Sequence, residues 1–158
     1  METAVRKAPT ERVQDTRPLI CFVCTGNTCR SPMAAALVCG ADGPYRAVSA
    51  GLAACVGAPI AENAVTALTL AGVVATPQNP YPSHTAIQLD EELVRRADLV
   101  VGMTGEHLLT MLMQFPSYAE KLRAMPTAIR DPFMGSTDVY RACLADIETG
   151  LRESGWLV

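Results

Sequence analysis

Apolar and polar positions follow two different periods along the chain. Short runs that are apolar throughout are typical of strands buried on both faces of a parallel sheet. Longer segments with apolar residues three or four positions apart indicate helices that bury one side. The predicted strands cover residues 19–23, 45–50, 99–103 and 121–125, with the last at a sheet edge. The predicted helices cover residues 31–38, 59–71, 90–96, 104–115 and a segment that follows Ser136.

The flanking residues indicate where several of these helices begin and end. We expect Ser31 to cap the first helix and Gly40 to end it, because serine accepts from free amides and glycine tolerates C-terminal geometry. Gly72 is expected to end the second helix, and Thr104 to cap the fourth. The apolar stripe predicted for the last helix consists of Val139, Cys143, Leu144, Ile147 and Leu151.

Alternating strands and helices predict an α/β fold, a single three-layer domain with a four-stranded parallel sheet flanked by helices. The domain is expected to span residues 18–158 of the 158-residue chain. Residues 1–17 are charged and lack the apolar segment of a secretory signal, so we expect a disordered N-terminal extension. Ligands of such sheets bind beyond the carboxyl ends of the strands, which is where residue 24 falls.

Composition and charge limit the classes of ligand and partner that we expect for this chain. The net charge is −3 and no basic run occurs, so nucleic acid is not an expected partner. No apolar stretch approaches the ~18 residues of a membrane span, so no membrane association is expected either. Six cysteines and two histidines show no paired metal-ligand spacing, which predicts neither metal nor cofactor. Free cysteines without a secretory signal predict a cytoplasmic protein, and we expect a monomer or weak dimer.

The densest chemistry lies in residues 24–32, which read Cys-Thr-Gly-Asn-Thr-Cys-Arg-Ser-Pro. A loop between a strand and a helix start points several amides at one place, where the helix dipole favours a tetrahedral oxyanion. Cys24 adds a nucleophile, and amides with a nearby cation favour its thiolate, so we expect an anionic sulfur at neutral pH. Arg30 adds a planar cation that can bind two phosphate oxygens at once. The pattern therefore predicts a phosphate-transfer site.

The remaining loop residues have individual expectations. Gly26 would allow left-handed or crowded backbone, and Asn27 would adopt left-handed geometry and hydrogen-bond across the loop. The Ser31 hydroxyl is expected to donate to the Cys24 thiolate. Cys29 either packs in the loop or captures an oxidised Cys24 as a reversible disulfide. The predicted phosphate-binding loop comprises Thr25, Gly26, Asn27, Thr28, Cys29 and Ser31.

From about residue 19 to the last helix, the sequence resembles the low-molecular-weight protein tyrosine phosphatase family. Residues 23–32 match every fixed position of that family's signature, V-C-x-G-N-x-C-R-S-P. Asp131-Pro132-Phe133 matches its second element, an Asp-Pro pair before the last helix. Taken alone, an aspartate before proline is more often a turn residue. With the signature, the resemblance implies that Asp131 is the general acid of a protein phosphatase.

The resemblance also implies a mechanism and supporting roles. Cys24 would attack phosphorus while Arg30 and loop amides bind the equatorial oxygens, giving a cysteinyl-phosphate. Asp131 would protonate the leaving atom and then activate water, releasing inorganic phosphate. The family uses no catalytic histidine, so His84 is expected to hydrogen-bond Asn27 and support the loop. Cys29 would be the redox partner of Cys24.

Two residues bear on which phosphorylated protein side chain is the substrate. The position of Thr28 resembles the protein arginine phosphatase branch, which has threonine there. Most tyrosine-directed members look to have an aliphatic residue at this position. A hydroxyl can meet a guanidinium, while a phenyl ring prefers an apolar wall. Phe133 followed by Met134, rather than by a second aromatic residue, also resembles the arginine branch. Phosphoarginine is therefore favoured over phosphotyrosine, with the tyrosine enzyme as the alternative.

Other classes of protein fit less well. Thioredoxin-coupled arsenate reductases share the loop but need two further downstream cysteines, and residues 56–142 contain none. Residues 21–24 have the Cys-x-x-Cys form of a redox motif, but in a strand Cys21 would point into the core. A non-catalytic phosphate-reading module would typically have lost Cys24, Arg30 or Asp131, and all three are present. His107, on an amphipathic helix, is predicted to lie at the surface.

Overall fold

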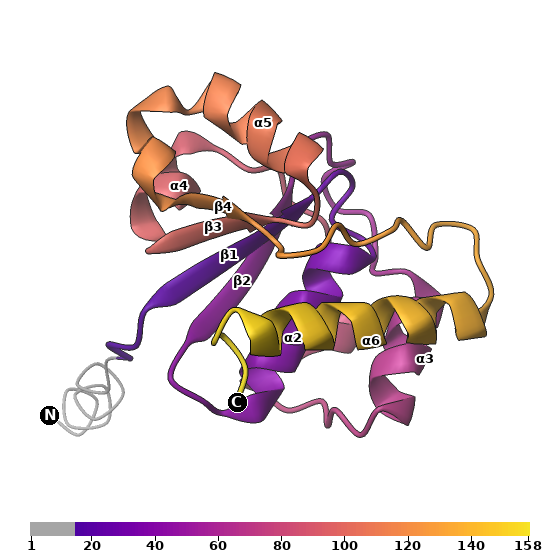
Figure 1. The fold of residues 1–158 in the computed structure, drawn as a ribbon. Coiled ribbons are helices and arrows are strands. Elements are labelled where there is room, and N and C mark those ends of the chain that lie inside the picture. Colours follow the sequence, from indigo (N-terminus) through magenta and orange to yellow (C-terminus); the bar gives the residue numbers. More distant parts are fainter. Residues whose placement is uncertain (1–14) are drawn as a thin grey trace, which may run out of the picture.

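The computed structural model describes residues 15–158 as one three-layer arrangement of strands and helices (Figure 1). The elements, in chain order, are β1 (Leu19–Cys24), α2 (Arg30–Ala41), β2 (Arg46–Gly51), α3 (Glu62–Leu70), η1 (Tyr81–Ser83), α4 (Glu91–Arg96), β3 (Leu99–Gly102), α5 (Gly105–Gln114), η2 (Pro116–Lys121), β4 (Leu122–Ala124) and α6 (Thr137–Glu153). Each predicted strand and helix is found within a few residues of its expected bounds.

The four strands are parallel and lie in the order β2-β1-β3-β4. The chain leaves the central strand β1 toward β2 on one side, and β3 pairs with the other side of β1. The direction of the crossovers therefore reverses beside β1, which opens a crevice at the carboxyl ends of β1 and β3. The predicted α/β class and four-stranded parallel sheet are confirmed.

Alternate side chains of β1 enter two separate cores. Ile20 and Phe22 pack with α2, α3 and α6 on one face of the sheet. Cys21 and Val23 pack with α4 and α5 on the other face (Figure 1). Because both faces are covered, every residue of β1 is buried and the whole strand is apolar.

The first helix begins and ends differently from the prediction. Helix α2 starts at Arg30 and has no side-chain cap, so Ser31 lies inside the first turn and caps nothing. The helix also continues through Gly40 and ends before Asp42, which has the left-handed φ of 52°. Gly72, with a φ of 87°, follows α3 as expected, and the predicted cap Thr104 begins α5.

The predicted stripe on α6 is correct except in its first turn. Cys143, Leu144, Ile147 and Leu151 are buried. Val139 is 47% exposed, and Tyr140 is buried in its place. A residue one position later faces the core at this end because the tyrosine hydroxyl reaches the Cys29 sulfur in the loop after β1.

The chain before β1 is partly described. Arg17 donates to the Gly43 carbonyl at 2.8 Å and pairs with the Asp15 carboxylate, which ties this point of the chain to the turn before β2. Residues 1–14 of the extension predicted to be disordered lie outside the described residues. Within residues 15–158, no helix combines the length and apolar character needed to cross a membrane.

The burial pattern of α6 makes a prediction about stability. Ile147 has no exposed surface, so Ile147→Ala is expected to lower the free energy of unfolding by roughly 2–5 kcal/mol through lost burial and a cavity. Val139→Ala, at the exposed position, should change it by only about 0.5 kcal/mol. Urea denaturation measures both, and equal losses would contradict the described face of α6.

Candidate active site

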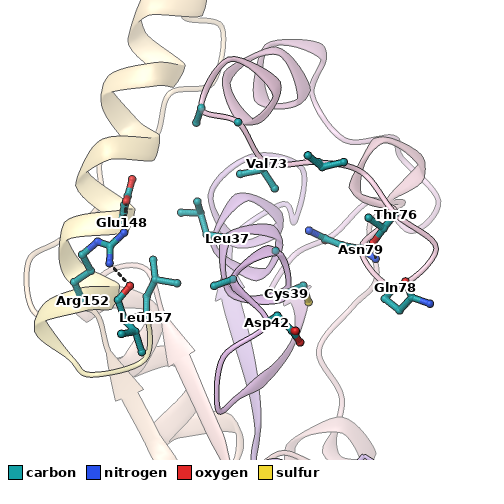
Figure 2. Close-up of a pocket in the computed structure, with 16 residues that line it drawn as sticks. Leu37, Cys39, Asp42, Val73, Thr76, Gln78, Asn79, Glu148, Arg152 and Leu157 are labelled. Atoms are coloured by element: carbon teal, nitrogen blue, oxygen red, sulfur yellow. Dashed lines mark hydrogen bonds and ion pairs between the residues drawn. The ribbon is translucent and has the colours of Figure 1, made fainter.

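One cavity of about 210 Å³ lies beyond the carboxyl end of β1 and is called the bowl below. It is lined by residues 24–30 together with Asp131 and Phe133. The predicted nucleophile, cation, acid and selectivity residues therefore share one space, while Ser31 and His84 lie behind the loop. A larger cavity of about 500 Å³, between the C-terminal ends of α2 and α6 and the chain after α3, contains none of them (Figure 2).

The end of β2 seats the start of the loop. Gly51 pairs with Cys24 across the sheet, and the next two amides donate to the Cys24 and Thr25 carbonyls at 3.0 and 2.9 Å. A Cβ at position 51 would lie 2.7 Å from the Thr25 carbonyl oxygen. Only glycine lets the two backbones approach this closely.

The Cys24 sulfur is held by two donors. The Asn27 amide donates to Sγ at 3.2 Å, and the Ser31 Oγ lies 3.0 Å from Sγ. Ser31 Oγ accepts from Asn27 Nδ2 at 2.8 Å, and its proton has two acceptors in reach, the Cys24 sulfur at 3.0 Å and the Ala50 carbonyl at 3.4 Å. A thiolate is the nearer and charged acceptor, so the proton donates to it when Cys24 is ionised. Both contacts stabilise negative charge on Sγ. The expected contact between Ser31 and Cys24 is present.

Asn27 organises the loop with all of its polar groups. It is fully buried and has a left-handed φ of 61°. Its Nδ2 donates to Ser31 and to Ser49 Oγ at 3.0 Å, and its Oδ1 accepts from the Ile87 amide at 3.0 Å. Its carbonyl accepts from His84 Nε2 at 2.9 Å. The expected contact between His84 and Asn27 is therefore present.

Gly26 does not have the expected geometry. Its φ is not left-handed, and a Cβ there would meet Thr28 Oγ1 only at 3.9 Å. The left-handed turn falls on Asn27 instead, because the asparagine side chain can compensate that backbone conformation with hydrogen bonds.

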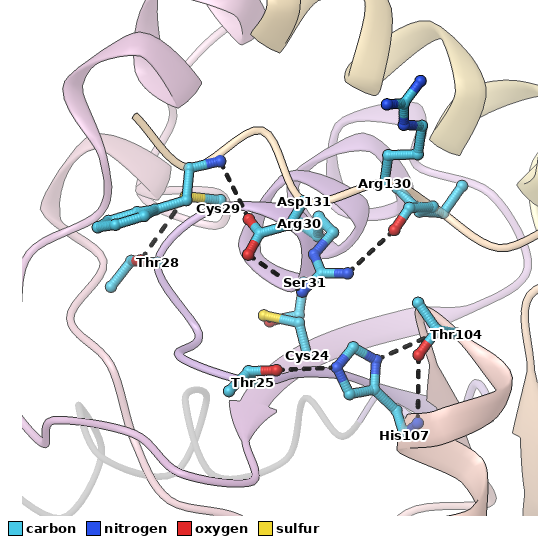
Figure 3. Close-up of polar contacts among 12 residues, drawn as sticks. Cys24, Thr25, Thr28, Cys29, Arg30, Ser31, Thr104, His107, Arg130 and Asp131 are labelled. Carbon is cyan, nitrogen blue, oxygen red and sulfur yellow. Dashed lines mark hydrogen bonds and ion pairs between the residues drawn. The ribbon is translucent and has the colours of Figure 1, made fainter. Parts of the chain in front are cut away.

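Arg30 and Asp131 line the bowl next to each other, on one side of Cys24 (Figure 3). Arg30 is buried, donates to the Ile129 carbonyl at 2.9 Å and lies 3.8 Å from Asp131 Oδ2. The Ile129 amide in turn donates to the Met103 carbonyl beyond β3. The chain after β4 thus follows the end of β3, which brings Asp131 to the bowl despite the short segment that separates it from α5.

The cysteines divide by burial. Cys29 Sγ lies 3.2 Å from the Tyr140 hydroxyl, and burial raises the pKa of its thiol. Cys21 and Cys143 are buried as expected, with thiol pKa values raised by burial to about 12. Cys39 is half-buried and Cys55 is an exposed loop thiol.

Across residues 15–158, no three His, Cys, Asp or Glu side chains are grouped to hold a metal ion.

His107 is buried, and the prediction that it lies at the surface is wrong. It is 7% exposed, not at the surface, and its Nε2 lies 3.0 Å from Thr25 Oγ1 (Figure 3). Burial, reinforced by the Arg30 charge, lowers its pKa to about 4. The signal in the sequence was its position three residues after Thr104, where a capping box has a side chain that turns back to the helix start.

Known proteins are similar to this chain in sequence and in fold. The model of the low molecular weight phosphotyrosine protein phosphatase family matches residues 19–155. The protein-arginine-phosphatase of Bacillus subtilis is 36% identical over 145 residues, covering 85% of this chain and 92% of that protein. A probable low molecular weight protein-tyrosine-phosphatase, EpsP of Ralstonia solanacearum, is 32% identical over 136 residues, covering 84% and 90%.

Among solved structures, the YwlE arginine phosphatase from Geobacillus stearothermophilus superposes with a TM-score of 0.78 at 34% identity, covering 87% of this chain and 90% of that one. The chain belongs to the low molecular weight phosphotyrosine protein phosphatase family. The resemblance inferred from the Cys-to-Pro loop is therefore confirmed, and the relatives include both arginine and tyrosine phosphatases.

Burial of His107 makes stability depend on pH. The unfolded chain binds a proton at His107 near the ordinary value of 6.5, whereas the folded protein does so only near 4. The unfolded state therefore holds more protons in this window, and stability falls as pH drops from about 6.5 to about 4. His107→Gln lacks this titration. The difference in unfolding free energy between wild type and variant should shrink over that window in urea titrations, and a constant difference would contradict the prediction.

Proposed function

We propose that this protein is a cysteine-dependent protein phosphatase that hydrolyses phosphorylated side chains and favours phosphoarginine over phosphotyrosine. One observation carries the proposal. The Cys24 sulfur receives two donors at the floor of the bowl, with Arg30 and Asp131 at its edge. A nucleophile, an anion-binding loop, a cation and an acid in one cavity are the parts that phosphoryl transfer requires.

In the first half-reaction, the Cys24 thiolate attacks phosphorus opposite the leaving atom. An S–P bond forms as the bond from phosphorus to nitrogen or oxygen breaks. Asp131 gives its proton to the departing atom, while Arg30 and the loop amides bind the three equatorial oxygens. The uncapped start of α2 leaves its first amides available for those oxygens.

In the second half-reaction, the Asp131 carboxylate takes a proton from a water molecule that attacks the cysteinyl-phosphate. The S–P bond breaks, and the sulfur leaves as a thiolate that the Ser31 hydroxyl stabilises from 3.0 Å. Inorganic phosphate departs. His84 and Asn27 keep the loop in the same shape through both steps, and Cys29 is the proposed redox partner of Cys24.

The preference for phosphoarginine rests on the rim of the bowl. Thr28 and the 66% exposed Phe133 both line it, and the chain over residues 52–55 presents no aromatic wall. A guanidinium has N–H groups that can donate hydrogen bonds to a threonine oxygen, whereas a phenyl ring has no such donor. The names of the Bacillus and Geobacillus relatives agree with this choice, and those of the tyrosine phosphatases support phosphotyrosine as the second candidate.

The cysteines do not support the alternative of an arsenate reductase, which needs a relay of disulfides, and they do not favour a secreted protein. Of the cysteines after the loop, Cys39 is half-buried, Cys55 lies in an exposed loop and Cys143 is buried, and none lies between residues 56 and 142. Arsenate reduction therefore has no support. The described cysteines are free thiols, which favours the cytoplasm, and the partners are phosphorylated proteins.

Removal of the acid should have a graded effect. Asp131→Asn is expected to slow hydrolysis of phenyl phosphate by about 10²-fold or more, and that of p-nitrophenyl phosphate much less, because a good leaving group needs little protonation. Steady-state kinetics across a leaving-group series measure this. Cys24→Ser is the control and should abolish turnover of every substrate. An equal loss for all leaving groups would contradict the acid role.

Thr28 should determine the preference for phosphoarginine over phosphotyrosine. Thr28→Ile is expected to shift the ratio of kcat/KM for phosphoarginine to that for phosphotyrosine peptides by roughly tenfold toward tyrosine, since it replaces an acceptor with an apolar surface. Thr28→Ser, which keeps the hydroxyl, is the matched control and should retain the wild-type ratio. An unchanged ratio in Thr28→Ile would overturn the assignment.

A further inference from the structure

His107 has a fixed hydrogen-bonding role that the phosphatase mechanism does not use. Its Nδ1 accepts from the Thr104 amide at 3.2 Å, while its own amide donates to Thr104 Oγ1 at 3.2 Å. Because Nδ1 accepts, it carries no hydrogen in the neutral ring, and the proton must sit on Nε2. Nε2 therefore donates to Thr25 Oγ1, 3.0 Å away.

The end of β3, the strand next to β1, makes this contact possible. Gly102 ends β3 directly beneath the first turn of α5, and a Cβ there would lie 2.7 Å from the His107 Cβ. The missing side chain lets the helix start come close enough for the ring to reach the loop. With a pKa of about 4, the ring is neutral at physiological pH and keeps this tautomer.

Thr25 lies on the lining of the bowl, and its hydroxyl is only partly used by His107. Thr25 directly follows Cys24, is exposed and is one of the residues that line the bowl. Figure 3 shows its hydroxyl against the His107 ring, beside Cys24. A threonine hydroxyl has one hydrogen and two lone pairs, and His107 occupies one lone pair. Among residues 15–158, His107 is the one hydrogen-bond partner of this hydroxyl. One lone pair and the proton are thus left for a substrate.

We propose that Thr25 is a second specificity-determining residue, which accepts a hydrogen bond from the guanidinium of phosphoarginine, and that His107 is the positioning residue that orients its hydroxyl. This inference rests on the proposed phosphatase function. A guanidinium next to phosphorus carries several N–H donors, and two threonine oxygens at the rim, Thr25 and Thr28, match them better than one. A phenyl ring has no donor for either oxygen.

The test compares kcat/KM for a phosphoarginine peptide with kcat/KM for p-nitrophenyl phosphate, using the full chain. Thr25→Val keeps the shape and removes the hydroxyl. It should lower the ratio of the two values by about tenfold, the effect of roughly one hydrogen bond. Thr25→Ser should keep the ratio. A ratio unchanged in Thr25→Val, or equal losses on both substrates, overturns the specificity role.

The His107 variants test how the effect is transmitted. His107→Leu should lower the ratio as Thr25→Val does, and the double variant should be no worse than either single one, because both remove the same contact. His107→Gln offers an acceptor oxygen and an NH2 group that can donate, and its ratio should lie closer to wild type. Losses that multiply in the double variant overturn the link between His107 and Thr25.

Two controls separate this inference from helix stability and from the proposed function. Thr104→Ala removes the side-chain half of the helix cap but leaves the imidazole in place, so the ratio should stay near wild type. A ratio lowered as far as in His107→Leu would mean that loss of the cap is responsible, which overturns the positioning role. Failure of the wild type to hydrolyse either substrate would overturn the phosphatase function itself, whatever the variants do.

Discussion

The site depends on one buried asparagine. Asn27 has a left-handed backbone, which costs a non-glycine residue of order 1–3 kcal/mol unless its surroundings compensate for it. The compensation is a set of hydrogen bonds that occupy its amide, its carbonyl and both ends of its side chain. Through its bonds to Ser49 in β2 and to the segment that contains His84 and Ile87, Asn27 fixes the loop to two other parts of the chain. No buried side-chain nitrogen or oxygen of residues 15–158 lacks a partner.

Fixed donors are what make such a loop useful for catalysis. Dipoles that already point at the position of developing charge need no reorganisation during the reaction. Here the loop is supported on opposite sides by two imidazoles, His84 at the Asn27 carbonyl and His107 at the Thr25 hydroxyl. Neither touches the sulfur. Their effect is to hold the rim and the floor of the bowl in one arrangement.

The sequence was most informative where a short segment determines its own structure. Apolar runs and 3.6-residue periods are local, and they predicted the sheet, its helices and the Cys-to-Pro loop. Local rules failed where a distant group competes for the same residue. Ser31 has the chemistry of a helix cap, but its hydroxyl is engaged by Asn27 and Cys24. Val139 fits the stripe of α6, but the contact between Tyr140 and Cys29 decides which residue faces inward.

By itself, the sequence determined the fold class, through the alternation of strand and helix patterns, and it identified Cys24 and Arg30, because both lie in one loop of nine residues. The role of Asp131 followed only from the family resemblance. Only the tertiary structure decided which distant groups complete the bowl. Asp131 lies over Arg30 because the preceding segment follows the end of β3. His107 lies against Thr25 because β1 and β3 are neighbours in the sheet and Gly102 leaves room. Thr25 and His107 are 82 positions apart in the sequence, and Arg30 and Asp131 about 100. Local sequence patterns do not reveal which residues so far apart along the chain are neighbours in space.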